Sequence, residues 1–154
     1  MLKIMFVCHG NICRSPMAEF YMKYIVEKAG LENDIFIASS ATSYEEIGND
    51  IHYGTKRVLD EHNIPYHSRK AQKFIEEDYE NYDLILLMDK NNIRNMRYIV
   101  PDDYDNKIKL LLSYAGENTS IADPWYTGEF ETTYKDIKRG CDTLLCYIKN
   151  HLTI

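Results

Sequence analysis

Four short apolar runs alternate along this chain with segments of helical periodicity, and this alternation limits the folds it can adopt. The runs are candidate strands at 2–7, 35–40, 83–88 and 107–112. Runs that are apolar throughout are typical of strands covered on both faces. Two further segments repeat apolar residues at helical spacing and predict buried helix faces. These residues are Met17, Phe20, Tyr21, Tyr24 and Ile25 in the first segment, and Ile137, Cys141, Leu144, Leu145 and Ile148 in the second.

The order of these segments predicts an α/β fold. We expect a single-domain three-layer sandwich over residues 1–154, with a doubly wound four-stranded parallel sheet and helices on both faces. A chain of this length can bury about two-thirds of its unfolded surface in one core. In such sheets ligands bind beyond the carboxyl ends of the strands, so loops that follow strands are the first places to look for a site.

The loop after the first predicted strand has the character of an anion site. A glycine-containing turn leads into a predicted helix with Ser15 at its N-cap and Pro16 at its first position. The Ser15 hydroxyl is expected to cap this helix, to donate to the Cys8 sulfur, or to do both. Backbone N–H groups and the helix dipole attract phosphate at such a start. Asn11 tolerates positive φ and is expected to brace the loop. The candidate phosphate-binding residues are His9, Gly10, Asn11, Ile12, Cys13 and Ser15.

Cys8 and Arg14 add chemistry to this loop. Cys8 stands at the end of the strand, where the helix start and Arg14 favour the thiolate, which is the nucleophilic form. Arg14 presents a planar fork that matches two phosphate oxygens. A lone cysteine at a strand end is more often a packing residue, but packing does not require an arginine and a serine at this spacing. Cys141 and Cys146 are expected to pack in the core.

If the thiol of this loop takes a phosphoryl group from an aryl phosphate, the departing phenolate needs an acid that protonates it. Asp123 is the candidate, and Pro124 biases it toward extended geometry. From spacing alone, a turn aspartate before proline is an equally good interpretation. Trp125 and Tyr126 follow and are predicted to be cleft walls that pack on an aryl ring, the alternative being a structural aromatic pair.

Composition excludes several function classes. The formal net charge of −6 and the pI near 5.3 disfavour nucleic-acid binding. No apolar run approaches the roughly 20 residues of a membrane span, and the start has no signal-like pattern. The four cysteines lack a CxxC zinc pattern and are too sparse for a disulfide framework. We therefore expect a cytoplasmic protein with reduced thiols, no metal site and no membrane contact.

The segment 7–19, Val-Cys-His-Gly-Asn-Ile-Cys-Arg-Ser-Pro-Met-Ala-Glu, resembles the signature of the low-molecular-weight protein tyrosine phosphatases. Segments 40–43 with 47–48, then 83–89 and 123–126, resemble later family blocks in the same order, so the resemblance covers essentially the whole chain. It implies hydrolysis of phosphotyrosine monoesters through a phosphocysteine intermediate, with Cys8, Arg14 and Asp123 as catalytic residues. It also implies no cofactor, phosphotyrosine-containing proteins as substrates, phosphate as product, and a monomer or weak dimer.

The resemblance further implies a reversible disulfide between Cys13 and Cys8, the alternative being that Cys13 only fills space beneath the loop. Relatives often carry an apolar residue where His9 stands, and the role of His9 is left open. Glu45 occupies the place of an aromatic cleft wall. Either Tyr44 replaces that wall, or the pocket is more acidic and would disfavour acidic phosphopeptides. His67 either braces the loop or is a surface turn residue.

Three other functions share parts of this pattern. Arsenate reductases have a similar loop but need relay cysteines, and no cysteine lies between Cys13 and Cys141. Protein arginine phosphatases of the family differ partly by a threonine where this chain has Ile12, so Ile12 favours phosphotyrosine. A phosphopeptide-binding module without activity would not need the full set of nucleophile, arginine and acid.

Overall fold

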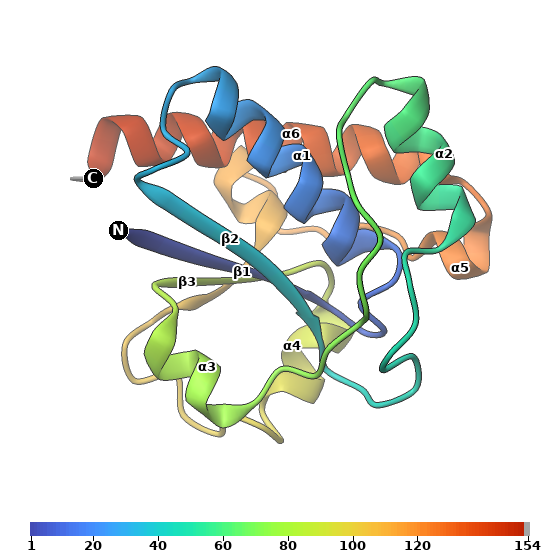
Figure 1. Cartoon of the computed structure of the whole chain (residues 1–154). Helices are drawn as coiled ribbons and strands as arrows, with labels where there is room; N and C mark the ends of the chain where they lie inside the picture. The colour runs from blue at the N-terminus through green and yellow to red at the C-terminus, as the bar shows by residue number, and fades with distance from the viewer. Residues whose placement is uncertain (153–154) are drawn as a thin grey trace.

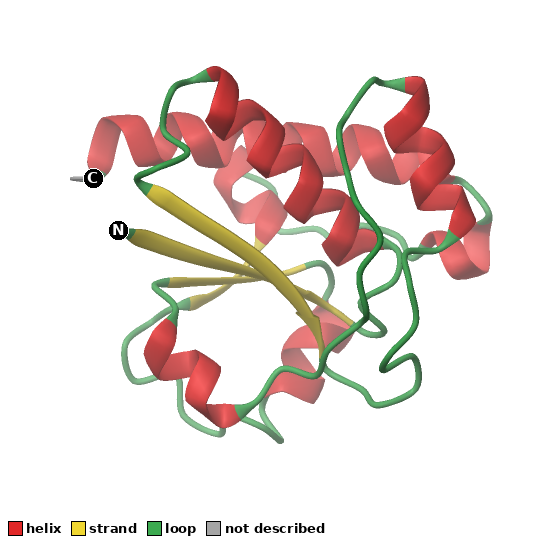
Figure 2. Ribbon diagram, in the orientation of Figure 1, coloured by secondary structure: helices red, strands yellow, loops and turns green. Residues whose placement is uncertain are grey.

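A computed structural model describes residues 1–152 of the protein. Four parallel strands form one sheet in the order β2-β1-β3-β4, and helices cover both of its faces (Figures 1 and 2). The predicted fold class is confirmed. In chain order the elements are β1 (Leu2–Cys8), α1 (Arg14–Lys28), β2 (Ile35–Ala41), α2 (Tyr53–Glu61), α3 (Glu76–Asn81), β3 (Leu84–Leu87), α4 (Lys90–Met96), β4 (Ile108–Leu110), η1 (Leu111–Ala115), α5 (Pro124–Thr127) and α6 (Phe130–His151).

Alternate residues of the central strand β1 supply two separate cores. Ile4 and Phe6 are fully buried against α1, α2 and α6, whereas Met5 and Val7 are buried with α3 and α4. Figure 1 shows α1, α2 and α6 on one side of the sheet and α3 and α4 on the opposite side. Both faces of β1 are therefore dry, which is why its sequence is apolar without alternation.

The fourth predicted strand is shorter than expected. Residues 107–112 were predicted to be extended, but β4 ends at Leu110 and the chain turns into the 3-10 helix η1. Leu110 is the last residue with a sheet partner, Leu87 at the end of β3. The Ser113 hydroxyl then donates to the Leu110 carbonyl at 2.6 Å, which occupies an acceptor that a longer strand would use. An apolar sequence alone cannot distinguish these two conformations.

The predicted helix start is also wrong, by two residues. Helix α1 begins at Arg14 with Cys13 at the N-cap, and no side chain caps it. Ser15 therefore lies inside the first turn instead of at the N-cap. Pro16 follows it in that turn, where a proline costs no hydrogen bond because the first N–H groups have no partner within the helix. The shift leaves the Ser15 hydroxyl free to serve the loop.

The long helix α6 confirms one cysteine prediction and contradicts another. Cys141 is fully buried with Ile137, Leu144 and Ile148, as their spacing predicted. Cys146 is exposed, so its predicted core role is wrong. Position 146 is five residues after 141, and that step carries a side chain well around the helix from the buried stripe.

The topology places the first loop at a crevice. From β1 the chain moves to β2 on one side, and β3 then pairs with the other side of β1. The loops at the carboxyl end of β1 therefore diverge, which is where open α/β sheets bind ligands. Cys8, the last residue of β1, lies at this point.

Gly140 of α6 packs too closely for any larger residue. A Cβ built there would lie 2.6 Å from Cγ of Leu111, which is fully buried. In an open helix Gly→Ala stabilises by about 1 kcal/mol, whereas overpacking a core costs about 1–3 kcal/mol. We expect Gly140→Ala to lower the free energy of unfolding in urea by about 1–2 kcal/mol. Cys146→Ala on the exposed face of the same helix should change it little, and equal stability of both variants would contradict this packing.

Candidate active site

The loop 9–13 is held from outside by its carbonyl groups. Each carbonyl from Cys8 to Cys13 except that of Gly10 accepts a hydrogen bond from a neighbouring segment, at 2.5 to 3.1 Å. With the carbonyls turned outward, the N–H groups of Gly10, Ile12 and Cys13 have no acceptor among residues 1–152. The donors are Thr42 for Cys8, Ser43 for His9, Arg69 for Asn11, His52 for Ile12 and Thr55 for Cys13.

Asn11 is the brace at the centre of this loop, as predicted. Its φ is 60°, which asparagine adopts more readily than most residues. Its side-chain amide donates to the hydroxyls of Ser15 at 2.8 Å and Ser39 at 2.9 Å, and its Oδ1 accepts from the Gln72 N–H at 3.1 Å. Its own N–H points to the Cys8 sulfur at 3.3 Å. One buried side chain therefore fixes the loop to β2, to α1 and to the segment after α2.

Arg69 completes the brace, and sequence reasoning had not singled it out. Its guanidinium donates to the Asn11 carbonyl at 2.5 Å. The nearby His67 was the candidate for this role, but its ring packs edge-on against Phe20 and its Nδ1 contacts the neighbouring Ser68 carbonyl. The alternative of a surface turn residue fits His67. The prediction of a brace at His67 lay two residues from Arg69, so it pointed to the right segment but the wrong residue.

Cys8 is 3% exposed, and its sulfur lies at the floor of the loop. It contacts the Ser15 hydroxyl at 3.1 Å in addition to the Asn11 N–H. The second thiol of the loop differs in its surroundings, because burial raises the pKa of Cys13 well above its ordinary value. Both thiols are free. Only Cys8 has two polar groups directed at its sulfur.

Arg14 is 2% exposed, and neighbouring residues contact its guanidinium at Nη1 and Nη2. Its Nη1 donates to Asp89 at 2.6 Å and to the Ile121 carbonyl at 2.9 Å, and Nη2 lies 3.4 Å from Asp123. Its Nε has no partner among residues 1–152. Burial acts to lower the pKa of Arg14, but Cys8, Asp123 and Asp89 outweigh it and raise the pKa. The guanidinium therefore stays charged.

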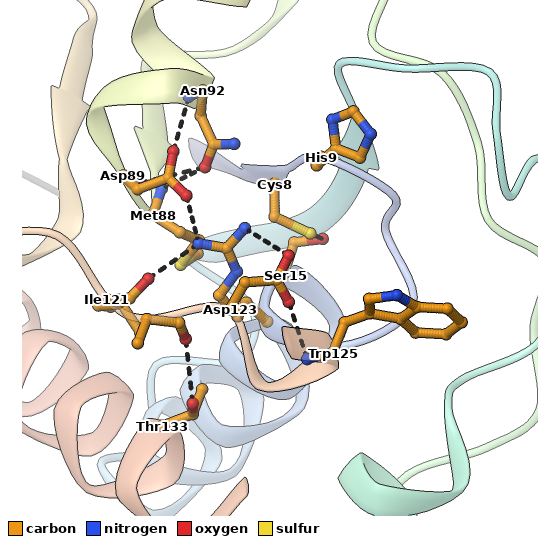
Figure 3. A network of polar contacts seen from close by, with 12 residues as sticks. Cys8, His9, Ser15, Met88, Asp89, Asn92, Ile121, Asp123, Trp125 and Thr133 are labelled. Carbon is orange, nitrogen blue, oxygen red and sulfur yellow. Dashed lines mark hydrogen bonds and ion pairs between the residues drawn. The ribbon is translucent and has the colours of Figure 1, made fainter. Parts of the chain in front are cut away.

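Asp89 was not predicted as a site residue, yet it holds Arg14. It caps α4, accepting from the Asn92 N–H at 2.7 Å, while the Asn92 side chain accepts from the N–H groups of Met88 and Asp89 at 3.1 Å. Figure 3 shows Asp89, Ile121 and Asp123 converging beside Cys8. An acidic residue after a strand is common in any sequence. Only the adjacency of β1 and β3 brings this one to Arg14.

Asp123 is held in an extended conformation at the start of α5, as Pro124 predicted. Its Oδ1 accepts from the Trp125 N–H at 3.1 Å, and the Thr133 hydroxyl fixes the preceding Ala122 carbonyl at 3.1 Å (Figure 3). The carboxylate is thereby anchored through one oxygen. The other oxygen faces Arg14 across the cleft.

The loop and the acid segment enclose one pocket. Its lining includes every predicted catalytic residue and most of the predicted binding residues. The predicted residues that the lining omits are Asn11 and Ser15, which lie behind the loop. The residues that line the pocket are Cys8, His9, Gly10, Ile12, Cys13, Arg14, Glu45, Glu46, Asp123, Trp125 and Tyr126. Trp125 and Tyr126 are largely exposed at the pocket wall, which is the position predicted for them.

The question about residues 44 and 45 is also answered by this pocket. Tyr44 is 76% exposed and does not line it, so it does not replace the missing aromatic wall. Glu45 and Glu46 line it instead, and Glu45 accepts from His9 Nε2 or pairs with it at 2.8 Å. The pocket is therefore more acidic on this side, as the second sequence alternative proposed.

Residues 1–152 contain neither a metal-ligand cluster nor a membrane-crossing helix. No group of three or more His, Cys, Asp or Glu side chains gathers there in a way that could hold a metal ion. In the same part of the chain, none of the helices has the length and apolar character needed to cross a membrane.

A thiol in an anion-binding loop at the carboxyl end of a central parallel strand defines a cysteine-dependent phosphatase site. Residues 3–153 match the family model of the low molecular weight phosphotyrosine protein phosphatases. The low molecular weight protein-tyrosine-phosphatase YfkJ of Bacillus subtilis is 38% identical over 151 residues, covering 97% of each chain. The chain belongs to this family and is a protein-tyrosine phosphatase, a hydrolase that acts on phosphoproteins.

Solved structures agree with this assignment. The crystal structure of YfkJ matches at a TM-score of 0.95 and 37% identity, covering 99% of this chain and 98% of that one. The low molecular weight protein tyrosine phosphatase of Streptococcus pyogenes matches at 0.86 and 38% identity, with 98% and 99% covered. A Drosophila arginine phosphatase matches at 0.86 and 28% identity, with 97% and 99% covered.

The Asn11 brace can be tested against a residue with the same backbone. Asn63 also has a positive φ, of 58°, but it is exposed at the end of α2. We expect Asn11→Ala to lower the free energy of unfolding by about 2–3 kcal/mol more than Asn63→Ala, because it leaves buried polar groups unpaired. Inorganic phosphate should also bind more weakly to the Asn11 variant alone, as measured by calorimetry. Equal effects of the two substitutions would contradict the brace.

Proposed function

We propose that Cys8 is the nucleophile, that Arg14 and the loop N–H groups bind the phosphoryl oxygens, and that Asp123 is the acid and base. The observation that carries this proposal is the set of unpaired donors around one sulfur. The N–H groups of Gly10, Ile12 and Cys13 have no acceptor among residues 1–152, and neither has Nε of Arg14. Nε of Arg14 is buried, and these four donors belong to residues that line the pocket, so they are available to a ligand that accepts from them.

In the first step the Cys8 thiolate attacks phosphorus. The sulfur–phosphorus bond forms as the bond between phosphorus and the phenolic oxygen breaks, and Asp123 gives its proton to that oxygen. The transition state is loose, with charge spread over three equatorial oxygens, so fixed donors and a cation supply most of the stabilisation. The Asn11 N–H donates to the sulfur and the Ser15 hydroxyl lies 3.1 Å from it, so both contacts hold the sulfur in place for the attack.

In the second step water attacks the phosphocysteine. The Asp123 carboxylate takes a proton from the water, the oxygen–phosphorus bond forms, and the bond to sulfur breaks. Cys8 leaves as a thiolate and inorganic phosphate is released. The same carboxyl group acts first as acid and then as base, so a single anchored residue is sufficient.

Asp89 has a positioning role in this scheme. It binds Nη1 of Arg14, together with the Ile121 carbonyl, and so fixes the edge of the guanidinium that faces away from the substrate. The opposite edge would meet two phosphoryl oxygens, because Nε has no partner among residues 1–152 and Nη2 has only the longer contact to Asp123 at 3.4 Å. Bidentate contacts of this kind give geometry as well as charge.

Two other reactions on this fold are less well supported. Arsenate reduction needs thiols that can reach the nucleophile, whereas Cys141 is fully buried in α6 and burial raises its pKa. Phosphoarginine hydrolysis has a structural neighbour in the Drosophila arginine phosphatase. In this chain Ile12 lines the pocket with an apolar side chain, which fits an aryl ring better than a guanidinium. Comparing p-nitrophenyl phosphate, phosphoarginine and arsenate as substrates separates the three.

We further propose that residues 1–154 form a single phosphatase domain that acts in the cytoplasm on phosphotyrosine-containing proteins, as a monomer or weak dimer. A nucleophilic thiol requires a compartment that keeps thiols reduced, which supports the cytoplasm.

Replacing the nucleophile gives the first test. Cys8→Ser should abolish turnover of p-nitrophenyl phosphate in the presence of a metal chelator, because a serine hydroxyl is not ionised at neutral pH. It should still bind inorganic phosphate in calorimetry, since the loop donors remain. Cys146→Ser, which removes an exposed thiol, is the matched control and should keep full activity. Normal turnover by the Cys8 variant would refute the assignment.

Asp123→Asn gives the second test. Asparagine can still cap α5 but cannot donate the catalytic proton, so kcat for phosphotyrosine should fall about 10²- to 10⁴-fold. The loss should shrink for aryl phosphates whose phenol is more acidic, because a better leaving group needs less protonation. A loss that is the same for every leaving group would show that Asp123 does not act as the acid. Equal thermal stability of the two proteins is the control for folding.

A further inference from the structure

The pocket described above adjoins a second hollow, and the two carry opposite charge on their outer sides. His9, Arg14, Asp123 and Tyr126 line both of them, so they form one continuous cleft. We call Glu45 and Glu46 the acidic lip. They line only the first hollow.

The acidic lip is built into the loop region. Glu45 is held 2.8 Å from His9 Nε2, with its carboxylate side chain 70% exposed to solvent. Glu46 packs its stem against the loop, because a Cβ added to Gly10 would lie 3.3 Å from its Cγ. Its carboxylate accepts from the Asn49 amide at 2.6 Å. Among residues 1–152 no lysine or arginine forms an ion pair with either glutamate, so the charge of this lip is available to a ligand.

The opposite side of the cleft is basic. Lys90 and Arg94 of α4, which we call the basic lip, line the second hollow, and both are exposed. Arg94 donates to the Asn91 amide oxygen at 2.8 Å, which leaves its charge uncompensated. Among residues 1–152 neither residue of the basic lip has a carboxylate partner within ion-pair distance. Figure 3 shows Asp89, which lines the second hollow, and His9, which pairs with Glu45, on different sides of Cys8.

A segment bound with its phosphotyrosine over Cys8 would therefore lie between unlike charges. Residues on one side of the phosphotyrosine reach the acidic lip and those on the other reach the basic lip. Like charges at each position repel and unlike charges attract, and this effect selects partners and their orientation more than it adds affinity. The net charge of −6 cannot produce such directionality, because it acts on the whole ligand.

We propose that this phosphatase selects phosphotyrosyl segments of one charge polarity, with basic residues on the side that meets Glu45 and Glu46 and acidic residues on the side that meets Lys90 and Arg94. This inference rests on the proposed function and names the class of substrate for the same site. Glu45 and Glu46, with Lys90 and Arg94, are specificity-determining residues and not catalytic ones, because they contact the flanks of the substrate.

Two peptides of identical composition test the polarity. One is Lys-Lys-pTyr-Glu-Glu and the other is Glu-Glu-pTyr-Lys-Lys, both blocked at their ends, so that their net charge is equal. Exposed ion pairs are weak individually, and several acting together should give about a five- to tenfold ratio of kcat/KM between the two peptides at low salt. The ratio should approach one at high ionic strength, because salt screens exposed charges.

Paired substitutions assign the ratio to the lips. Glu45→Gln with Glu46→Gln, and separately Lys90→Gln with Arg94→Gln, should each bring the ratio toward one. Glu76→Gln with Glu77→Gln on α3 removes the same two charges from an exposed site that lines neither hollow, so this variant should keep the wild-type ratio. Because the readout is a ratio between peptides, a general change in kcat cancels.

The outcomes are distinct. A ratio that differs from one in the wild type and collapses in both lip variants supports the proposal. Equal rates on the two peptides by an enzyme that hydrolyses p-nitrophenyl phosphate, or a ratio unchanged in the lip variants, overturns it while the proposed function stands. Failure to hydrolyse both p-nitrophenyl phosphate and the neutral peptide Ala-Ala-pTyr-Ala-Ala refutes the proposed function, and the polarity proposal falls with it.

Discussion

Asn11 holds a left-handed backbone conformation in the middle of the loop, and the geometry of the site depends on the contacts that keep it there. Its amide bonds to β2 and α1, while Gln72 and Arg69 bind its Oδ1 and its carbonyl oxygen. Neighbouring carbonyls are turned outward by similar bonds. Since peptide N–H and C=O point in opposite directions, anchoring the carbonyls outside aims the N–H groups inward. The anion site is thus a consequence of how the loop is tied to its surroundings.

The charged groups Arg14, Asp89 and Asp123 likewise depend on the contacts that hold them in place. Arg14 would be costly to bury alone, and Asp89 and Asp123 offset that cost while raising its pKa. The two carboxylates differ in function because they differ in support. Asp89 is fixed to α4 through Asn92 and binds Arg14 at 2.6 Å, whereas Asp123 is anchored through one oxygen and lies 3.4 Å away. The looser contact suits the role proposed for Asp123, in which its carboxyl group exchanges a proton with substrate and water.

Outside this centre the cleft differs between its two sides. Acidic residues follow the end of β2 and basic residues lie on α4, and the residues proposed to be catalytic lie between them. Catalytic groups are constrained by the reaction, but these outer residues are constrained only by the ligand they meet. The charge of these outer residues is therefore the feature of the structure that bears most directly on the choice of substrate. His9 connects the two sides, because it lines both hollows and pairs with Glu45.

The sequence predicted the α/β class, three of the four strands, and the roles proposed for Cys8 and Arg14, because these follow from local periodicity and from a rare combination of residue types in one loop. For Asp123 the local spacing fitted a turn residue equally well, and the resemblance to the family pointed to an acid. The sequence did not locate the end of the fourth strand or the first residue of α1, since apolar and turn residues there fit two conformations. The contacts that Asp89, Arg69 and Gln72 make with Arg14 and Asn11 depend on the tertiary structure. These three residues reach the loop from positions 58 to 75 residues away along the chain from the groups that they bind. Strand order makes them neighbours, and no spacing in a single sequence records which strands pair.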